Sequence, residues 1–178
     1  MCELLGDRFR LVVPDLPGVG RSAIPAADRP LSGAALGTFI GELQEALGIG
    51  GCLTVGNSLG GYLCLRAALQ DPGRFARLAV VHPPMFEPRL VALHAALAVP
   101  GVAAVLARVA RHDPLRWAHS QVHYYDETLK SLEEAHEYGE RLASAAGAHA
   151  FVRYLNDPLA SPRPARLAEM LVDFLERP

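Results

Sequence analysis

Cysteine is scarce in this sequence, and its scarcity excludes two kinds of stabilising site. Three cysteines occur among the 178 residues, at positions 2, 52 and 64, without any Cys-x-x-Cys pair. Three cysteines cannot all pair within one chain, and closely spaced cysteine pairs are the usual mark of structural zinc sites. Cys52 and Cys64 lie in apolar segments. We therefore expect them to be reduced core residues of a cytoplasmic protein.

An excess of charge of one sign is also missing. The chain has 17 Lys and Arg against 19 Asp and Glu, a net charge of −2, with no basic stripe. Because nucleic acids are bound chiefly by clustered cations, the composition argues against a nucleic-acid partner. The first seven residues lack the basic-then-apolar pattern of a signal peptide.

Long uninterrupted apolar runs are missing as well. Only residues 91–110 resemble a membrane span, and Pro100-Gly101 divides that segment in the middle, while His94 and Arg108 interrupt it. Two short apolar helices are the expected structure, and no membrane partner is predicted.

What remains is the composition of a globular chain, and its first half alternates strand and helix signals. At 178 residues and 51% hydrophobic content, the chain is long enough for one domain with a core. Apolar runs at residues 9–13, 52–55 and 78–81 predict strands, with helices between them. Continuous apolar strands alternating with helices predict an α/β fold, with a parallel sheet covered on both faces.

The first predicted helix follows Ser32, a plausible N-cap, and ends at a glycine-rich segment. Its apolar positions have helical spacing. They are Leu36, Phe39, Ile40, Leu43 and Leu47, with Glu42, Gln44 and Glu45 on the opposite face and Gly48, Gly50 and Gly51 at the end. A second helix is predicted over residues 59–70, ending at Asp71-Pro72-Gly73.

The second half lacks strand signals. Residues 86–155 are rich in Ala, Leu and His and predict helices, with breaks near Pro100-Gly101, residues 112–114 and Ala146-Gly147. Residues 167–175 predict a last amphipathic helix.

Residues 56–61, Gly-Asn-Ser-Leu-Gly-Gly, join a predicted strand to a predicted helix. Gly-x-Ser-x-Gly in that setting resembles the nucleophile elbow of the α/β-hydrolases. A nucleophilic serine must stand clear of the sheet, so the chain turns sharply there and strains the serine backbone. Because strand and helix nearly touch, the residues two positions away on each side must be small.

A second motif lies about forty residues upstream. Residues 9–22 form an apolar run followed by Pro-Asp-Leu-Pro-Gly-Val-Gly-Arg-Ser. This segment looks like the α/β-hydrolase strand and loop usually written P-D-x-P-G-x-G-x-S. With the elbow, it makes residues 8–84 resemble the α/β-hydrolase fold superfamily. We expect the Asp15 carboxylate to fix this loop by accepting hydrogen bonds from nearby N–H groups.

The resemblance implies a serine hydrolase, either an esterase or a C–C bond hydrolase. Ser58 would attack a carbonyl carbon, and the backbone N–H of Leu59 would donate to the oxyanion. The expected substrate is a small apolar ester or ketone-type molecule, and this acyl transfer needs no cofactor and no metal. Serine at the elbow argues against dehalogenase or epoxide-hydrolase chemistry, which uses aspartate there. The other elbow residues are Gly56, Asn57, Gly60 and Gly61.

The resemblance also implies a domain plan and shows what the sequence lacks. Residues 1–84 would be a partial core, residues 85–165 a helical cap and residues 166–178 a terminal helix. The family's His-Gly oxyanion loop and its C-terminal Asp and His have no counterpart at the expected positions. We expect a fragment with weak or no activity. Unpaired strand edges, at a gap between residues 9–13 and 52–55, would favour self-association.

Other candidate residues have weaker support. Where some relatives carry the catalytic acid, this chain has His82-Pro83-Pro84, with Glu87 as the nearest carboxylate. His119 and His123 have the spacing of a metal pair without a third ligand. Asp126 and His149 have the family's acid-then-histidine order, but no strands hold them. The alternative hypothesis is a catalytically silent, hydrolase-like fragment that serves as a binding or assembly module.

Overall fold

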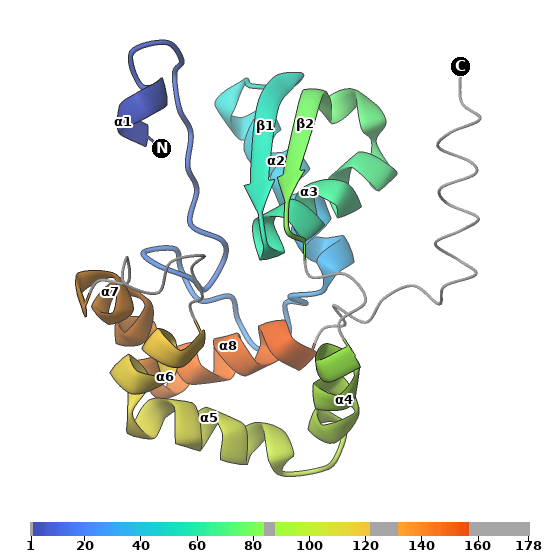
Figure 1. The fold of residues 1–178 in the computed structure, drawn as a ribbon. Helices are drawn as coiled ribbons and strands as arrows, with labels where there is room; N and C mark the ends of the chain where they lie inside the picture. The colour runs from blue at the N-terminus through green and yellow to red at the C-terminus, as the bar shows by residue number, and fades with distance from the viewer. Residues whose placement is uncertain (1, 84–87, 122–131, 157–178) are drawn as a thin grey trace. The chain divides into compact units, whose positions relative to one another are not determined.

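The computed structural model describes residues 2–83, 88–121 and 132–156, and the chain divides into two compact units (Figure 1). The helical unit comprises residues 1–26 and 104–151, and the sheet unit comprises residues 27–103 and 152–178. The functional division into core, cap and terminal helix stays a prediction, and the predicted helix over residues 167–175 lies outside the described residues.

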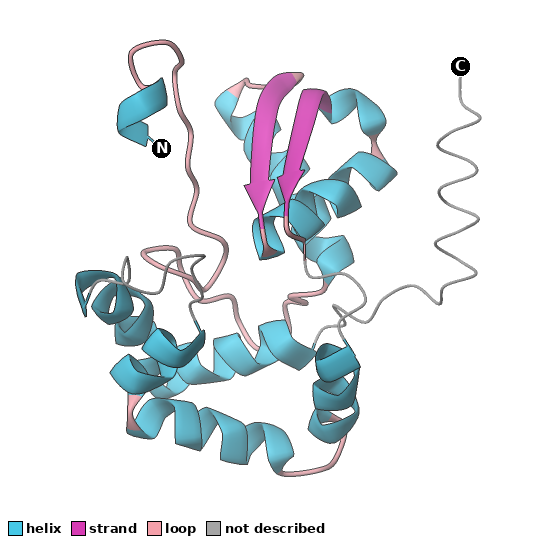
Figure 2. Cartoon of the chain, in the orientation of Figure 1, coloured by secondary structure: helices cyan, strands magenta, loops and turns pink. Residues whose placement is uncertain are grey.

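The sheet unit contains a parallel pair of strands joined by a helix. Its elements in chain order are α2 (Gly33–Leu47), β1 (Cys52–Asn57), α3 (Leu59–Gln70), the 3-10 helix η1 (Pro72–Arg74), β2 (Phe75–Val81) and α4 (Pro88–Leu97). β1 and β2 are parallel, with Leu53 opposite Arg77 and Asn57 opposite Val81. α3 connects the two strands and packs against both (Figure 2). The predicted alternation of helix and strand over residues 32–81 is confirmed.

Helix α2 begins and ends where the sequence predicts. The Ser32 side chain accepts a hydrogen bond from the Ala35 N–H at 3.1 Å, which satisfies one of the unpaired donors of the first turn. At the other end Gly48 has φ 62°, the left-handed conformation that terminates many helices. Both ends are therefore determined by residues within a few positions of the helix.

The buried face of α2 differs from the prediction. Gln44, predicted on the polar face, is 5% exposed, whereas Leu47, predicted on the apolar face, is 41% exposed. The buried residues include three glycines four positions apart, and a Cβ on Gly37 would lie 3.2 Å from the Ala67 nitrogen of α3. Two features determine which face of α2 is buried. Its glycines allow α3 to pack closely, and the Gln44 amide has hydrogen-bond partners in the interior.

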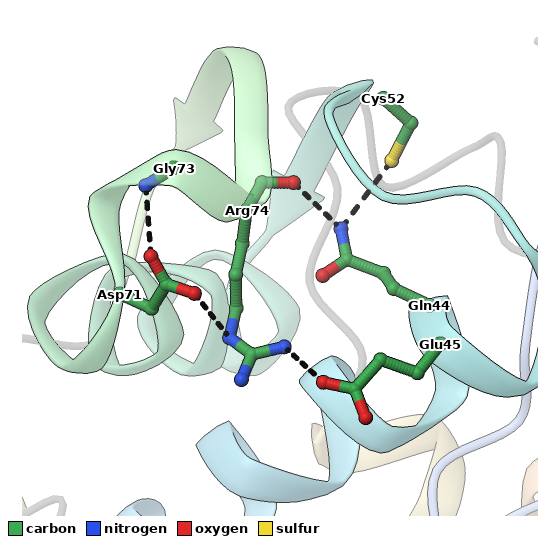
Figure 3. Close-up of polar contacts among 6 residues, drawn as sticks. All are labelled: Gln44, Glu45, Cys52, Asp71, Gly73 and Arg74. Atoms are coloured by element: carbon green, nitrogen blue, oxygen red, sulfur yellow. Dashed lines mark hydrogen bonds and ion pairs between the residues drawn. The ribbon is translucent and has the colours of Figure 1, made fainter.

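Those partners form a cluster between α2 and the start of β2 (Figure 3). Gln44 Nε2 donates to the Arg74 carbonyl at 3.1 Å and to Cys52 Sγ at 3.4 Å. The Arg74 guanidinium pairs with Glu45 at 3.3 Å and with Asp71 at 3.6 Å. Both carboxylates are mostly exposed, so these ion pairs contribute no more than about 1 kcal/mol. The hydrogen bonds of the buried Gln44 amide hold the end of α2 against β1 and β2.

Both cysteines of the sheet unit are free thiols, as the sequence predicts. Cys64 is 7% exposed, and burial raises the pKa of its thiol, with the nearby Cys52 as the smaller cause. Cys64 is a core residue, and Cys52 is half-buried.

Only one face of the two-stranded sheet is covered among the described residues. Leu53 and Val55 of β1 and Val81 of β2 are 60%, 59% and 52% exposed. These side chains share the face opposite α3, because alternate residues of a strand point to opposite sides. The prediction of a sheet covered on both faces is wrong for the described chain, since no helix of the sheet unit covers that side.

The helical unit contains helices that pack through small residues and aromatic rings. Its elements are α1 (Cys2–Leu5), most of α5 (Val102–His112), α6 (Pro114–Gln121), α7 (Leu132–Ala143) and most of α8 (Ala145–Asn156). The rings of Trp117 and Phe151 meet edge to face at 6.2 Å. A Cβ on Gly139 would lie 3.1 Å from the Pro114 carbonyl oxygen, so α6 and α7 approach closely.

Two of the three predicted helix breaks are confirmed, and the third is displaced. Residues 98–101 separate α4 from α5, and Asp113 starts α6 by accepting the Arg116 N–H at 3.0 Å. The third break lies at Ser144, not at Ala146-Gly147. The Ser144 hydroxyl accepts the Gly147 N–H at 2.9 Å, which places Gly147 inside the first turn of α8.

The predicted strand over residues 9–13 is wrong. Residues 10–16 have no regular secondary structure, and within the described chain the sheet consists of β1 and β2 alone. Val13 is 75% exposed and Leu11 38% exposed. A strand requires a neighbour for its N–H and C=O groups, and no described strand lies beside this one. Among the described residues no ladder joins residues 9–13 to residues 52–55, as the expected gap between them requires.

Over the described residues, no helix has both the length and the hydropathy that crossing a bilayer requires. The apolar segment around Pro100-Gly101 forms two helices, α4 and α5, as predicted.

Candidate active site

Ser58 lies alone between a parallel strand and a helix. β1 ends at Asn57, α3 begins at Leu59, and the serine has φ 49° and ψ −123°. A side chain with a Cβ rarely adopts positive φ, and such a conformation costs about 1–3 kcal/mol. The predicted sharp, strained turn at Ser58 is confirmed.

Glycines permit this turn, although not all of those that the sequence suggests. A Cβ on Gly56 would lie 2.7 Å from the Cα of Gly61, and a Cβ on Gly61 would lie 2.8 Å from the Gly56 carbonyl oxygen. Around Gly60 no atom lies within 4 Å of a Cβ. The expectation of a steric need for glycine two residues after the serine is therefore wrong. The close contact falls at Gly61, because α3 turns its next residue toward β1.

The backbone groups of Ser58 are both engaged, while its side chain is exposed. Its N–H donates to the Val81 carbonyl of β2 at 2.9 Å, and its carbonyl accepts from the Tyr62 N–H at 3.1 Å. The hydroxyl makes no capping hydrogen bond to α3. The turn is thus held by the main chain, and the hydroxyl is left for other partners.

Leu59 is the first residue of α3, so its N–H is one of the four that have no acceptor within the helix. The first turn of α3 has no acidic residue to neutralise the positive end of the helix dipole. An anion that forms beside Ser58 would be stabilised there. The exposed Asn57 lies next to Ser58, opposite Val81.

A small apolar cavity adjoins the elbow within the sheet unit. Its empty volume is about 180 Å³, open solvent included. The residues that line it are Leu31, Gly33, Leu36, Leu59, Tyr62, Leu63 and Tyr154. Burial raises the pKa of Tyr154 to about 12, against a smaller opposing effect of Arg153, so the phenol is neutral at physiological pH.

The loop of residues 14–22 belongs to the helical unit. The Asp15 carboxylate accepts the Arg21 N–H at 2.9 Å, and the Asp15 carbonyl accepts the Ser22 hydroxyl at 2.8 Å. Arg141 of α7 donates to the carbonyls of Gly20 and Ser22. The predicted role of Asp15 as a residue that fixes the loop is confirmed.

Most other candidates from the sequence are not brought together. His119 lies exposed on α6 and His149 exposed on α8, while Glu87, His123 and Asp126 lie outside the described residues. Across residues 2–83, 88–121 and 132–156, no three His, Cys, Asp or Glu side chains are grouped as a metal site.

His82 is the exception. It is the residue after β2, it is exposed, and it has φ 45°. Sequence reasoning treated its position only as a place for an acid. The sequence could have singled out His82, because His82 and Ser58 each follow one of two predicted parallel strands. Parallel strands end at the same edge of a sheet, so the residues that follow them lie close together.

A family model for the alpha/beta hydrolase fold matches residues 1–136 of this sequence. The chain belongs to the α/β-hydrolase fold family. The match extends beyond residues 8–84, where the sequence motifs lie.

Two curated relatives of this chain are hydrolases by name. One is "Putative carbamate hydrolase RutD" of Caulobacter sp. (strain K31), 41% identical over 80 residues, which are 45% of this chain and 30% of the relative. The other is the (lyso)-N-acylphosphatidylethanolamine lipase of Homo sapiens, 36% identical over 83 residues, which are 46% of this chain and 24% of the relative. The aligned segments thus span less than a third of either relative.

Among solved structures, the haloalkane dehalogenase DatA of Agrobacterium tumefaciens C58 has the same fold. The TM-score is 0.64 at 20% identity, over 92% of this chain and 57% of the dehalogenase. A likeness at this identity establishes the fold alone. The present chain has a serine, Ser58, at its elbow. Its function is therefore inferred from its own site and not from the dehalogenase.

Proposed function

We propose that this chain is the elbow-bearing part of a serine hydrolase that cleaves ester bonds, or C–C bonds beside a ketone. The observation that carries the proposal is Ser58, held at φ 49° between a parallel strand and a helix with its side chain exposed. Such strain persists only where the surrounding structure imposes it, and it is concentrated at functional sites. In this proposal residues 85–165 form the cap, and the protein is cytoplasmic.

The chemistry proposed for the elbow is acyl transfer. The Ser58 oxygen attacks the substrate carbonyl, and the Leu59 N–H donates to the oxygen that becomes negative. Gly56 and Gly61 permit the turn, and Asn57 and Gly60 complete it. The Ala- and Leu-rich composition of residues 86–155 supports a small apolar acyl group as the substrate moiety. The reaction needs no cofactor and no metal.

The proposed activity is weak. A serine hydroxyl must lose its proton to attack, and a triad supplies a histidine and a carboxylate for that purpose. No such pair is assembled beside Ser58 in the described residues. Loss of triad members lowers turnover by roughly 10⁴-fold or more in serine proteases.

The test is the hydrolysis of p-nitrophenyl acetate and the covalent labelling by a fluorophosphonate probe. We expect slow labelling and slow turnover, and both should disappear in Ser58→Ala. Ser22→Ala is the matched control, because the Ser22 hydroxyl donates to the Asp15 carbonyl of its own loop. Labelling that survives in Ser58→Ala would refute the proposal. Brisk turnover that Ser58→Ala abolishes would refute the expectation of weak activity.

A second candidate function is a silent binding or assembly module. The exposed face of β1 and β2, with Leu53, Val55 and Val81, favours it, because such apolar surfaces mark interaction sites. A second copy of this chain is the expected partner. The flanking coding sequence separates the two candidates: a His-Gly motif upstream and an Asp and His downstream would favour the hydrolase.

A further inference from the structure

Two non-glycine residues in the described part of the chain have positive φ, and they are neighbours. Ser58 has φ 49° and His82 has φ 45°. Ser58 follows β1, and His82 follows β2. Because each such conformation costs about 1–3 kcal/mol, two side by side at one sheet edge need a common explanation.

The main chain fixes their proximity. Asn57 is paired with Val81 at the end of the ladder, and the Ser58 N–H donates to the Val81 carbonyl at 2.9 Å. In a parallel ladder that bond places Ser58 opposite His82. Neighbouring strands lie about 4.8 Å apart, so a serine and a histidine at opposite positions are within side-chain reach.

Both side chains are exposed and available. Within the described residues, no hydrogen bond or ion pair engages the imidazole of His82, and the Ser58 hydroxyl does not cap α3. The two side chains do not bond to each other in this structure. Catalytic hydrogen bonds are often formed only when a substrate is bound. Rotation of the exposed His82 imidazole toward the Ser58 hydroxyl would then form this one.

We propose that His82 is the proton acceptor for the Ser58 hydroxyl. This inference rests on the proposed hydrolase function and adds a catalytic residue to it. As the bond from the serine oxygen to the carbonyl carbon forms, the hydroxyl proton passes to the imidazole, and the carbonyl π electrons move to the oxyanion. When the intermediate collapses, the leaving group departs with that proton. Water then releases the acyl group by the same steps in reverse order.

This role is compatible with weak activity. In a triad, a carboxylate orients the histidine and stabilises the imidazolium that forms. In the described chain no carboxylate pairs with His82. His82 would therefore supply the proton transfer, typically worth 10²–10⁴-fold, without the assistance of an acid.

The experiment measures the second-order rate of fluorophosphonate labelling for the full chain and four variants. In labelling, the serine oxygen bonds to phosphorus, fluoride leaves, and the proton stays on the imidazole. His82→Asn removes the base but retains a residue type that tolerates left-handed φ, and it should label about 10²-fold more slowly. His82→Gly relieves the strain, and added imidazole should restore part of its rate. Ser58→Ala should not label.

His112→Gln is the control, since His112 lies exposed near the end of α5, and it should label at the parent rate. Parent-rate labelling of His82→Asn and His82→Gly, with Ser58→Ala silent, would overturn the role of His82 and leave the proposed function standing. Slow labelling of His82→Gly that imidazole does not restore would also overturn it. Undiminished labelling of Ser58→Ala would overturn the proposed function itself.

Discussion

The segments around Ser58 and from Phe9 to Ser22 both resemble motifs of one family, yet they fold differently. The elbow has its strand, its strained serine and its helix, whereas residues 10–16 have no regular structure. Every group that the elbow needs lies between residues 52 and 81. The strand predicted over residues 9–13 needs a hydrogen-bonded neighbour, and none is described. A family motif therefore has its expected structure in this chain where the contacts that support it are near in sequence.

The loop of residues 14–22 refines this comparison, because it is ordered although the residues before it form no strand. The Asp15 carboxylate accepts the Arg21 N–H within the loop itself. The Gly20 and Ser22 carbonyls of the loop accept hydrogen bonds from Arg141, which is distant in sequence. A loop of this kind needs no sheet beneath it.

A side chain placed at the close contact between β1 and α3 should have the largest effect. Gly56→Val places side-chain atoms where the Gly61 backbone lies, and it should lower the free energy of unfolding by about 3 kcal/mol or more. Thermal unfolding measures the change. The matched control is Gly60→Ala, which meets open space and should be neutral or stabilise by up to about 1 kcal/mol. Equal loss in both variants would contradict the packing described for the elbow.

The exposed sheet face should control self-association. The double variant Leu53→Lys/Val55→Lys places two charges on this face, and we expect assembly to need about tenfold higher concentration, or about 1.4 kcal/mol. Sedimentation over a concentration series measures it. Leu69→Lys, at a 48% exposed position of α3, should leave association unchanged. A parent chain that stays monomeric throughout would remove the basis for this prediction.

The loop should be less sensitive than the elbow. Asp15→Ala removes the acceptor of an exposed backbone N–H, and it should lower stability by about 1 kcal/mol, a typical value for one hydrogen bond. Hydrogen exchange at the Arg21 amide gives a local measure. Asp28→Ala, at another exposed loop position, is the control and should change neither quantity. Unchanged exchange in Asp15→Ala would show that the loop is held by other contacts.

The smallest effect should come from the segment that forms no strand. Val13→Lys alters a side chain that is 75% exposed, so stability should stay within about 0.5 kcal/mol of the parent value. Urea denaturation is sufficient to measure this. A loss of 2 kcal/mol or more would mean that residues 9–13 are buried in solution as a strand of the sheet.

The sequence by itself determined the elements whose signals are local. Ser32 and Gly48 delimit α2, Asp71 follows the last residue of α3, and the elbow turn falls at Ser58 as its glycine pattern predicts. Each signal acts over a few residues, through a capping hydrogen bond or a backbone conformation that few residue types adopt.

Only the tertiary structure decided which groups meet across the chain. Helical spacing placed Gln44 on the polar face of α2, but the Arg74 carbonyl and Cys52 give its amide partners in the interior. Spacing likewise singled out Gly60, whereas the close approach of α3 to β1 falls at Gly61. The position of His82 opposite Ser58 depends on the strand register, which joins residues 24 positions apart through backbone hydrogen bonds that no local pattern encodes.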